Sequence, residues 1–247
     1  MDKRVVFITG AGKGIGAAIA VLAAQRGYAV AINYRDDAQA ANGVREQIEA
    51  FGGTAIAVQG DVASIADVER MLAHSRAKLG PLHALVNSAG ITGPIGKFAQ
   101  TDAAMIEEVF RTNVFGTMNC CRAAVRLFQG SGKGGVIVNL SSTAATTGSP
   151  NEYVHYAASK AAIDTFTLGL AREVAAEGIR VCGVAPGSTL TGIHAKAGEP
   201  ERPARLAPII PMQRLAQPEE IAEAVLWLMS DAASYSTGST LRCGGGL

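Results

Sequence analysis

The chain has no excess of charge of either sign and no long hydrophobic run. It holds 22 Lys and Arg residues against 21 Asp and Glu residues, so its net charge at pH 7 is +1. This balance predicts no strongly acidic or basic partner, and we expect no binding to nucleic acid. No stretch reaches the roughly 20 apolar residues of a membrane span, so we expect no membrane association.

Cysteine is scarce, and its positions exclude the usual metal sites. The four cysteines, Cys120, Cys121, Cys182 and Cys243, lack the spacing of zinc ligands, so we expect reduced, mostly buried thiols and no bound metal. The sequence also has no internal repeat, low-complexity tract or interdomain linker. Its first residues, Met-Asp-Lys-Arg, lead directly into a strand-like run without the apolar region of a signal peptide, so we expect a cytoplasmic protein.

The composition suits one well-packed domain. Hydrophobic residues make up 48 % of the chain and charged residues 17 %, which provides material for a sizeable core. The length of 247 residues matches one large α/β domain, because such folds commonly reach roughly 200 to 250 residues without dividing. We therefore expect residues 1–247 to form a single domain.

Apolar, β-branched runs alternate with helical patterns along most of the chain. We expect strands at 4–9, 29–34, 54–59, 84–87, 135–140 and 180–185, and a last one within 238–247. Continuous apolar strands separated by helices are typical of a parallel sheet that helices cover on both faces. The pattern therefore predicts an α/β Rossmann fold, with a doubly wound parallel sheet of about seven strands.

One segment interrupts this alternation. Between residues 187 and 217 the chain has prolines at 200, 203, 208 and 211 and glycines at 187, 192 and 198. We expect residues 188–217 to form a mobile flap over a substrate site, and we call this segment the flap. Helical periodicity resumes over 218–229.

A glycine-rich segment follows the first predicted strand and precedes a helical pattern over 17–26. Its residues are Gly10, Ala11, Gly12, Lys13, Gly14, Ile15 and Gly16. Glycines between a strand and a helix let backbone N–H groups approach a pyrophosphate. The spacing departs from the common Gly-x-Gly-x-x-Gly fingerprint, and the alternative is an ordinary tight turn.

The end of the second strand indicates the choice of cofactor. An acidic residue there would bind a ribose 2′-hydroxyl, but Tyr34 stands in its place and Arg35 follows. Lys13 in the glycine-rich segment is expected to reach the same side, and two cations favour the 2′-phosphate of NADP(H). In the alternative, Arg35 is a surface residue, Asp36 or Asp37 supplies the acid, and the cofactor is NAD(H).

Three further residues form a candidate proton-transfer site. Tyr156 and Lys160 are four residues apart, so on a helix they share one face. The ammonium group can then act on a phenol whose ordinary pKa is about 10. Ser142 follows the strand predicted at 135–140, at the carboxyl edge of the sheet where ligands bind in open α/β folds.

The order of these motifs resembles the short-chain dehydrogenase/reductase family over essentially the whole chain. The matching elements are Thr9-Gly-x-x-x-Gly-Ile-Gly16, Asp61-Val62, Asn87-Ser-Ala-Gly90, Asn113, Ser142, Tyr156-x-x-x-Lys160 and Pro186-Gly187. Three positions depart from the family pattern: Ser88 replaces an asparagine, Thr189 replaces a branched aliphatic residue, and Cys182 replaces another asparagine.

The resemblance implies a catalytic tetrad of Asn113, Ser142, Tyr156 and Lys160. Tyr156 would be the general acid or base, Ser142 would bind the substrate oxygen, Lys160 would lower the tyrosine pKa and bind the ribose, and Asn113 would hold a relay water. The implied cofactor-binding residues are Gly10, Gly12, Lys13, Gly14, Ile15, Gly16, Tyr34, Arg35, Asp61, Val62, Asn87, Ala89, Gly90, Tyr156, Lys160, Pro186, Gly187, Thr189 and Thr191.

The expected activity is NADP(H)-dependent interconversion of a carbonyl and a secondary alcohol in a small molecule. Resemblance leaves 3-oxoacyl thioesters and sugars open as substrates, and it implies a homotetramer that packs helices at about 102–128 and 153–177. A regulator that binds NADP(H) without turnover is the alternative function. A hydrolase pair of Ser142 and His155 is disfavoured, because the sequence around the serine lacks a Gly-x-Ser-x-Gly elbow. We expect His155 to line the pocket or face solvent, and His194 to be a mobile surface residue.

Overall fold

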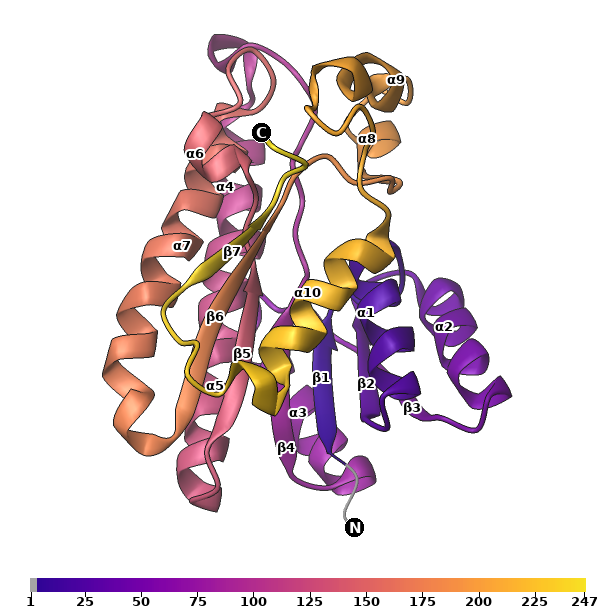
Figure 1. The fold of residues 1–247 in the computed structure, drawn as a ribbon, viewed down its shortest axis with the longest axis vertical. Coiled ribbons are helices and arrows are strands. Elements are labelled where there is room, and N and C mark those ends of the chain that lie inside the picture. Colours follow the sequence, from indigo (N-terminus) through magenta and orange to yellow (C-terminus); the bar gives the residue numbers. More distant parts are fainter. Residues whose placement is uncertain (1–3) are drawn as a thin grey trace.

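The computed structural model describes residues 4–247; Met1 to Lys3, the first residues of the expected 1–247 domain, lie outside this range. The described chain forms one sheet of seven strands (Figure 1). The strands are β1 (Val5–Thr9), β2 (Ala29–Tyr34), β3 (Thr54–Gln59), β4 (Leu82–Asn87), β5 (Gly135–Leu140), β6 (Ile179–Pro186) and β7 (Thr240–Cys243). Every neighbouring pair is parallel, in the order β3-β2-β1-β4-β5-β6-β7.

Helices connect the strands. The α-helices are α1 (Gly14–Gln25), α2 (Ala38–Ala50), α3 (Ile65–Leu79), α4 (Ala103–Phe110), α5 (Thr117–Ser131), α6 (Ala144–Thr147), α7 (Val154–Val174), α8 (Ile193–Lys196), α9 (Arg202–Leu206) and α10 (Pro218–Met229). Short 3-10 turns are η1 (Phe98–Gln100), η3 (Ala175–Glu177), η4 (Ala207–Ile209) and η5 (Asp231–Ala233), and η2 (Arg111–Gly116) is a π-helical turn.

The sheet is buried on both faces, because its strands send alternate apolar side chains into two cores. Val6 and Ile8 pack with α1 and α10 on one face, whereas Phe7 between them packs with α3 and α5 on the other. Figure 1 shows α1, α2 and α10 over one face of the sheet. The structure therefore confirms the predicted doubly wound parallel sheet.

Most predicted elements match the observed ones. The bounds predicted for β2, β3 and β5 agree with the structure, and α10 spans the predicted 218–229. The start of α10 is well specified by sequence: Pro218 occupies the first turn, and Glu220 accepts a hydrogen bond from the Gln217 N–H at 2.8 Å. The first helix begins at Gly14, three residues before the predicted start.

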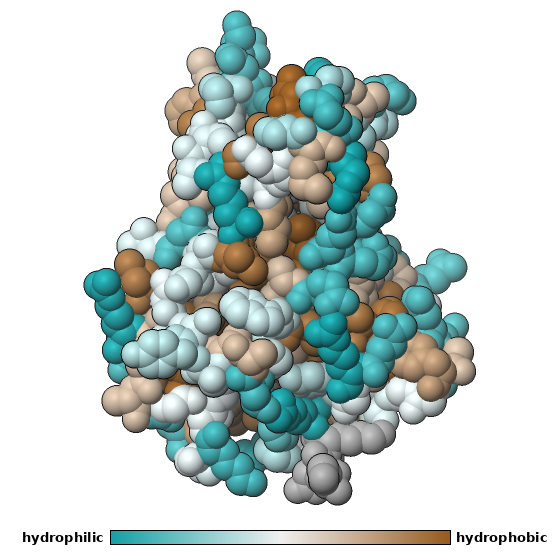
Figure 2. All heavy atoms as spheres, in the orientation of Figure 1, coloured by the Kyte–Doolittle hydropathy of each residue, from teal (hydrophilic) through white to brown (hydrophobic). Residues whose placement is uncertain are grey.

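The strand order reverses between β1 and β4, which lie side by side although two βα units separate them in sequence. The loops after these strands diverge and leave a crevice at the carboxyl edge of the sheet. The flap lies beyond this edge, with α8 and α9 above the strand ends in Figure 1. Figure 2 shows hydrophilic and hydrophobic residues interspersed over the side of the molecule that is seen in Figure 1. Within residues 4–247, no helix is both long and apolar enough to span a bilayer.

Candidate functional site

A cavity of about 660 Å³ lies at the carboxyl edge of the sheet. Its walls come from the loops after β1, β2, β3, β4, β5 and β6, from the start of α7 and from the flap. The predicted site residues that line it are Gly10, Gly12, Lys13, Gly14, Ile15, Gly16, Tyr34, Arg35, Asp61, Val62, Ala89, Gly90, Ser142, Tyr156, Lys160, Pro186, Gly187, Thr189 and Thr191. The remaining two, Asn87 and Asn113, lie behind its wall, with 3 % and 0 % of their surface exposed.

The glycine-rich segment makes a turn in which two glycines are closely packed against the protein's own backbone. Gly10 has φ of +63°, and a Cβ added to it would lie 2.8 Å from the Ala89 Cα. A Cβ on Gly16 would lie 2.5 Å from the Gly10 carbonyl oxygen, so only glycine allows this turn. Within the described chain, no side chain caps the N-terminus of α1, which leaves its first N–H groups free to bind an anion such as a pyrophosphate.

Asn33 fixes this loop from the end of β2. Its Oδ1 accepts the Gly10 N–H at 3.2 Å, and its Nδ2 donates to the carbonyl oxygen of Gly60, just after β3, at 3.0 Å. The buried side chain therefore joins two walls of the cavity. Asn33 was not among the predicted site residues, although an amide near the end of an otherwise apolar strand was a signal for it.

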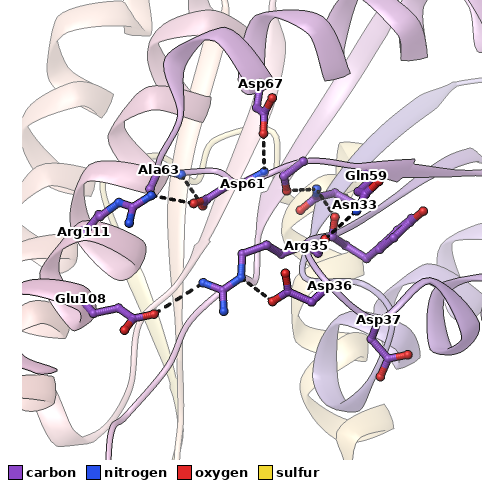
Figure 3. Close-up of polar contacts among 12 residues, drawn as sticks. Asn33, Arg35, Asp36, Asp37, Gln59, Asp61, Ala63, Asp67, Glu108 and Arg111 are labelled. Atoms are coloured by element: carbon purple, nitrogen blue, oxygen red, sulfur yellow. Dashed lines mark hydrogen bonds and ion pairs between the residues drawn. The ribbon is translucent and has the colours of Figure 1, made fainter.

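The acidic residues after β2 lie beside the cations Lys13 and Arg35 at the cavity. Lys13 pairs with Asp37 at 2.9 Å, and Arg35 pairs with Asp36 at 2.7 Å. Glu108 on α4 lies 3.6 Å from the Arg35 guanidinium (Figure 3). Asp37 also caps α2 by accepting the Ala40 N–H at 3.0 Å. Both sets of residues considered for cofactor choice therefore line the same end of the cavity.

Asp61 is held in place by contacts on both of its sides. Its carboxylate accepts the Ala63 N–H and the Arg111 guanidinium, each at 2.9 Å (Figure 3). Its own N–H donates to the Asp67 carboxylate at 2.9 Å. These bonds orient Asp61 and the adjoining Val62 at the wall of the cavity.

Ser142, Tyr156 and Lys160 converge on the other half of the cavity. Ser142 follows β5, whereas Tyr156 and Lys160 project from successive turns of α7. The Lys160 ammonium lies 5.7 Å from the centroid of the Tyr156 ring and donates to the Leu140 carbonyl oxygen at 2.7 Å. The predicted sharing of one helix face therefore holds in the structure.

Burial shifts the pKa values of both α7 residues. It raises the pKa of Tyr156 above 10.0, while a hydrogen bond with Ser142 and the charge of Arg202 oppose the rise. Burial lowers the pKa of Lys160 from 10.5 to about 8, and the charge of Asp164 opposes the fall. The expected lowering of the tyrosine pKa by Lys160 stays a prediction.

Asn113 lies in the π-helical turn η2, directly behind the cavity. Its Oδ1 accepts the Ile91 N–H at 2.9 Å, and its Nδ2 donates to the Ile91 carbonyl oxygen and to the Ser159 Oγ. A Cβ on Gly90 would lie 3.3 Å from the Asn113 Oδ1 and 3.5 Å from the Lys160 Nζ. The three residues are therefore packed together: a Cβ on Gly90 would need a small shift of the Asn113 side chain and would meet Lys160 at ordinary contact distance.

Two predictions about histidines are wrong. His155 neither faces solvent nor lines the cavity: it is 3 % exposed, and its Nε2 bonds to the Thr92 carbonyl oxygen. His194 is 4 % exposed rather than a surface residue, because its Nε2 bonds to the Thr189 carbonyl oxygen and its Nδ1 lies 3.1 Å from Arg202. Tertiary contacts of the flap, which local sequence does not reveal, bury His194.

The flap is joined to the start of α7 by a buried ion pair. Arg202 of α9 donates to the Glu152 carboxylate at 2.5 Å, and Arg205 donates to the same carboxylate at 2.7 Å. The Arg202 guanidinium also stacks 5.1 Å from the Tyr153 ring, which meets Tyr156 edge to face at 5.3 Å. This chain of contacts connects the flap to the candidate acid–base residue.

The fold and the site define an α/β protein of the dinucleotide-binding type, with Ser142, Tyr156 and Lys160 at its cavity. A family model described as "Enoyl-(Acyl carrier protein) reductase" matches residues 10–247. The chain is 48 % identical to an Escherichia coli protein named uncharacterized oxidoreductase YgfF, over 98 % of this chain and 99 % of that one.

Further relatives agree with this assignment. The chain is 39 % identical to 3beta-hydroxysteroid dehydrogenase 1 of Eggerthella lenta, over 100 % of this chain and 94 % of that one. It is 36 % identical to the 3-oxoacyl-[acyl-carrier-protein] reductase FabG of Staphylococcus aureus, over 98 % and 96 %. A crystal structure of a dehydrogenase/reductase from Sinorhizobium meliloti superposes with a TM-score of 0.92 at 34 % identity, covering 100 % of this chain and 95 % of that one.

The chain belongs to the short-chain dehydrogenase/reductase family. It is therefore an oxidoreductase of a family that binds nicotinamide cofactors and interconverts carbonyls and alcohols.

Proposed function

We propose that this protein interconverts a carbonyl and a secondary alcohol with NADP(H), using Tyr156 as the general acid or base. The observation that carries the proposal is the convergence of Ser142, Tyr156 and Lys160 on a cavity that they share with the glycine-rich loop. A cofactor laid along that loop would bring its reactive ring to these three side chains.

The residues present fit a dinucleotide, because the glycine-rich turn places the uncapped N-terminus of α1 at the cavity, where its N–H groups can bind the pyrophosphate. The cofactor, when bound, supplies or accepts the hydride. Ser142 donates a hydrogen bond to the substrate oxygen, and Tyr156 gives that oxygen a proton during reduction or removes one during oxidation. Lys160 stabilises the tyrosinate that remains after reduction, and Asn113 holds the start of a proton relay to solvent.

The cofactor preference is supported by the cations at the ribose end. Lys13 and Arg35 both line the cavity there, as a 2′-phosphate requires. Asp36 and Asp37 are their partners in this structure, so a bound phosphate would compete with two carboxylates. Titration of the protein with NADPH and NADH, repeated with Arg35→Asp, tests the preference: tighter NADPH binding that is lost in the variant supports it, and tighter NADH binding contradicts it.

The proposed substrate belongs to one of two classes, 3-oxoacyl thioesters or sugars. The FabG relative acts, by its name, on the first of these, whereas another relative is named for a steroid. Apolar side chains at the substrate end of the cavity, from Leu206, Ile209 and Leu247, favour the thioester, because an acyl chain would bury against them. Steady-state rates with a short 3-oxoacyl thioester and with free sugars separate the two classes.

Tyr156→Phe tests the mechanism itself. Loss of the phenol oxygen removes the proton donor but keeps the ring, so kcat should fall by about 10²- to 10⁴-fold while NADPH binding is kept. A variant that retains full turnover contradicts the assignment. If neither form turns over any substrate while both bind NADPH, a regulator that binds the cofactor without turnover is the better description.

We also propose that residues 1–247 act as a single domain with residues 188–217 as the substrate flap. The proposed assembly is a cytoplasmic homotetramer, and its test is given in the Discussion.

A further inference from the structure

The flap brings a lysine to the ribose end of the cavity. Lys196 ends α8, and it lines the same cavity as Lys13 and Asp37. The flap begins against the glycine-rich loop, because a Cβ on Gly14 would lie 3.3 Å from the Thr191 Cγ2. The short distance along the chain from Thr191 therefore keeps Lys196 close to the loop that carries Lys13.

Lys196 differs from the other two cations in its partners. Lys13 and Arg35 each bond to a neighbouring carboxylate, at 2.9 and 2.7 Å. Lys196 makes no ion pair with any residue of the described range 4–247. Within this range, no carboxylate is therefore paired with the Lys196 ammonium group.

The surroundings of Lys196 disfavour its charge. Burial lowers its pKa below 10.5, and the nearby Lys13 and Arg35 lower it further, while Asp37 opposes them. The Asp37 pKa is in turn lowered by its bond to the Ala40 N–H, by Lys13 and by Lys196. The ammonium groups of Lys13 and Lys196 therefore repel each other and share the influence of one carboxylate, Asp37. An additional anion close to both ammonium groups would attract each of them and offset this repulsion.

We propose that Lys196 is a third cation for the 2′-phosphate of NADP(H), supplied by the flap. The inference rests on the proposed NADP(H) preference and extends it from the β2 end to the flap. The pyrophosphate is a less suitable partner, because Asp37 and Arg35, whose charges act on Lys196, follow β2 at the ribose side of the cavity. Binding of the 2′-phosphate therefore holds α8 over the cofactor. NAD(H) lacks this phosphate and does not hold α8 in this way.

Adenosine 2′,5′-bisphosphate and 5′-AMP are the probes that isolate the phosphate. Their dissociation constants are measured for the wild type, Lys196→Met, Arg35→Met and the control Lys133→Met, which removes an exposed lysine outside the cavity. We expect Lys196→Met to weaken the bisphosphate about tenfold, as loss of one charge-assisted contact does, and to change 5′-AMP binding less than twofold. Lys196→Arg should keep most of the affinity, and Lys133→Met should match the wild type.

Hydrogen exchange supplies a readout of the flap. In the wild type, NADP⁺ should slow exchange of the amides over 193–206 more than NAD⁺ does at equal saturation, and Lys196→Met should remove that difference.

Distinct results overturn the two proposals. A bisphosphate preference that is lost in Arg35→Met but unchanged in Lys196→Met overturns the role of Lys196 alone. Equal weakening of both probes by Lys196→Met also overturns it, because the lysine then acts on a group that the probes share. A wild-type protein that binds the bisphosphate no more tightly than 5′-AMP overturns the cofactor proposal, and the flap contact with it.

Discussion

Lys160 is an amine that the fold holds in a place unfavourable to its charge. Burial lowers its pKa from 10.5 to about 8, so between these values the unfolded chain binds a proton that the folded protein does not. Unfolding therefore takes up a proton in this range, and the free energy of unfolding rises with pH. The residue proposed for catalysis reduces stability at neutral pH, as expected of a functional group kept at a cost.

Comparison with Lys160→Met tests this directly. The stability of the wild type relative to the variant should increase as pH rises from about 8 towards 10.5, with a slope of up to about 1.4 kcal/mol per pH unit. Urea unfolding at pH 7, 8, 9 and 10 measures it, and Lys133→Met is the exposed-lysine control. Parallel stability curves for wild type and Lys160→Met would show that the folded and unfolded pKa values are alike.

Asn33 is an uncharged polar residue that the fold buries at the same cavity. Asn33→Leu keeps the approximate size but removes the bonds to the Gly10 N–H and the Gly60 carbonyl oxygen. We expect a loss of about 1–3 kcal/mol of unfolding free energy, since buried polar groups lose their partners. Cofactor affinity should fall as well, because the glycine-rich loop loses its support. Asn42→Leu, which removes a solvent-side bond to Ala38 on α2, is the control for both measurements.

Sequence predicted the residues whose chemistry depends on spacing along one element. Tyr156 and Lys160 share a helix face, and the glycine-rich segment lies between a strand and a helix. It did not predict Asn33, because the partners of its amide come from other loops. It placed His155 wrongly for the same reason, because Thr92, which bonds to its ring, is distant in sequence. It placed His194 wrongly because the flap folds on itself, so that Thr189 and Arg202 contact the ring and bury it.

At the scale of elements, periodicity and capping predicted the regular parts of the fold. The apolar runs at β2, β3 and β5 and the proline and glutamate at the start of α10 are strong local signals. The helices α8 and α9 within the flap are only four and five residues long. Helices this short carry no periodicity, so a sequence rich in proline and glycine gave no sign of them.

The flap is fastened by Arg202 and Glu152, and a double-mutant cycle measures how strongly. The variants are Arg202→Gln, Glu152→Gln and their combination, and we expect a coupling energy of about 1–3 kcal/mol, since the Arg202 side chain is only 9 % exposed. The exposed pair Arg45 and Glu49 on α2 is the control, with an expected coupling of about 0.3–0.5 kcal/mol. Equal couplings for the two pairs would contradict a fastening role.

The pH dependence of this coupling has a definite sign. Burial raises the Glu152 pKa, but the bonds from Arg202 and Arg205 outweigh it and hold the pKa below 4.5. The stabilisation is therefore fully present above pH 4.5 and is lost as pH falls through the lowered pKa.

Substrate binding should follow the same contacts, so Arg202→Gln should raise KM more than it lowers kcat.

At the scale of the whole molecule, one face of α7 is not covered by any part of the described residues 4–247. Val154, Ala158, Leu168 and Gly169 are exposed along α7, with 40 % of Val154 and 39 % of Leu168 accessible. Small residues on such a face permit the close approach of a second helix, and apolar neighbours gain from burial there. This stripe matches the surface through which the family resemblance implies a homotetramer.

Leu168→Glu tests the assembly, because a carboxylate within this stripe would have to be buried without a partner in the tetramer. Light scattering on the wild type should give four times the chain mass of 25.4 kDa, and the variant should give a smaller particle with unchanged far-UV circular dichroism. Phe51→Glu is the matched control, since Phe51 is 44 % exposed just after α2, away from α7. A wild-type particle of 25.4 kDa would contradict the tetramer outright. A Leu168→Glu protein that keeps the wild-type mass would instead show that the copies meet through another face of the molecule.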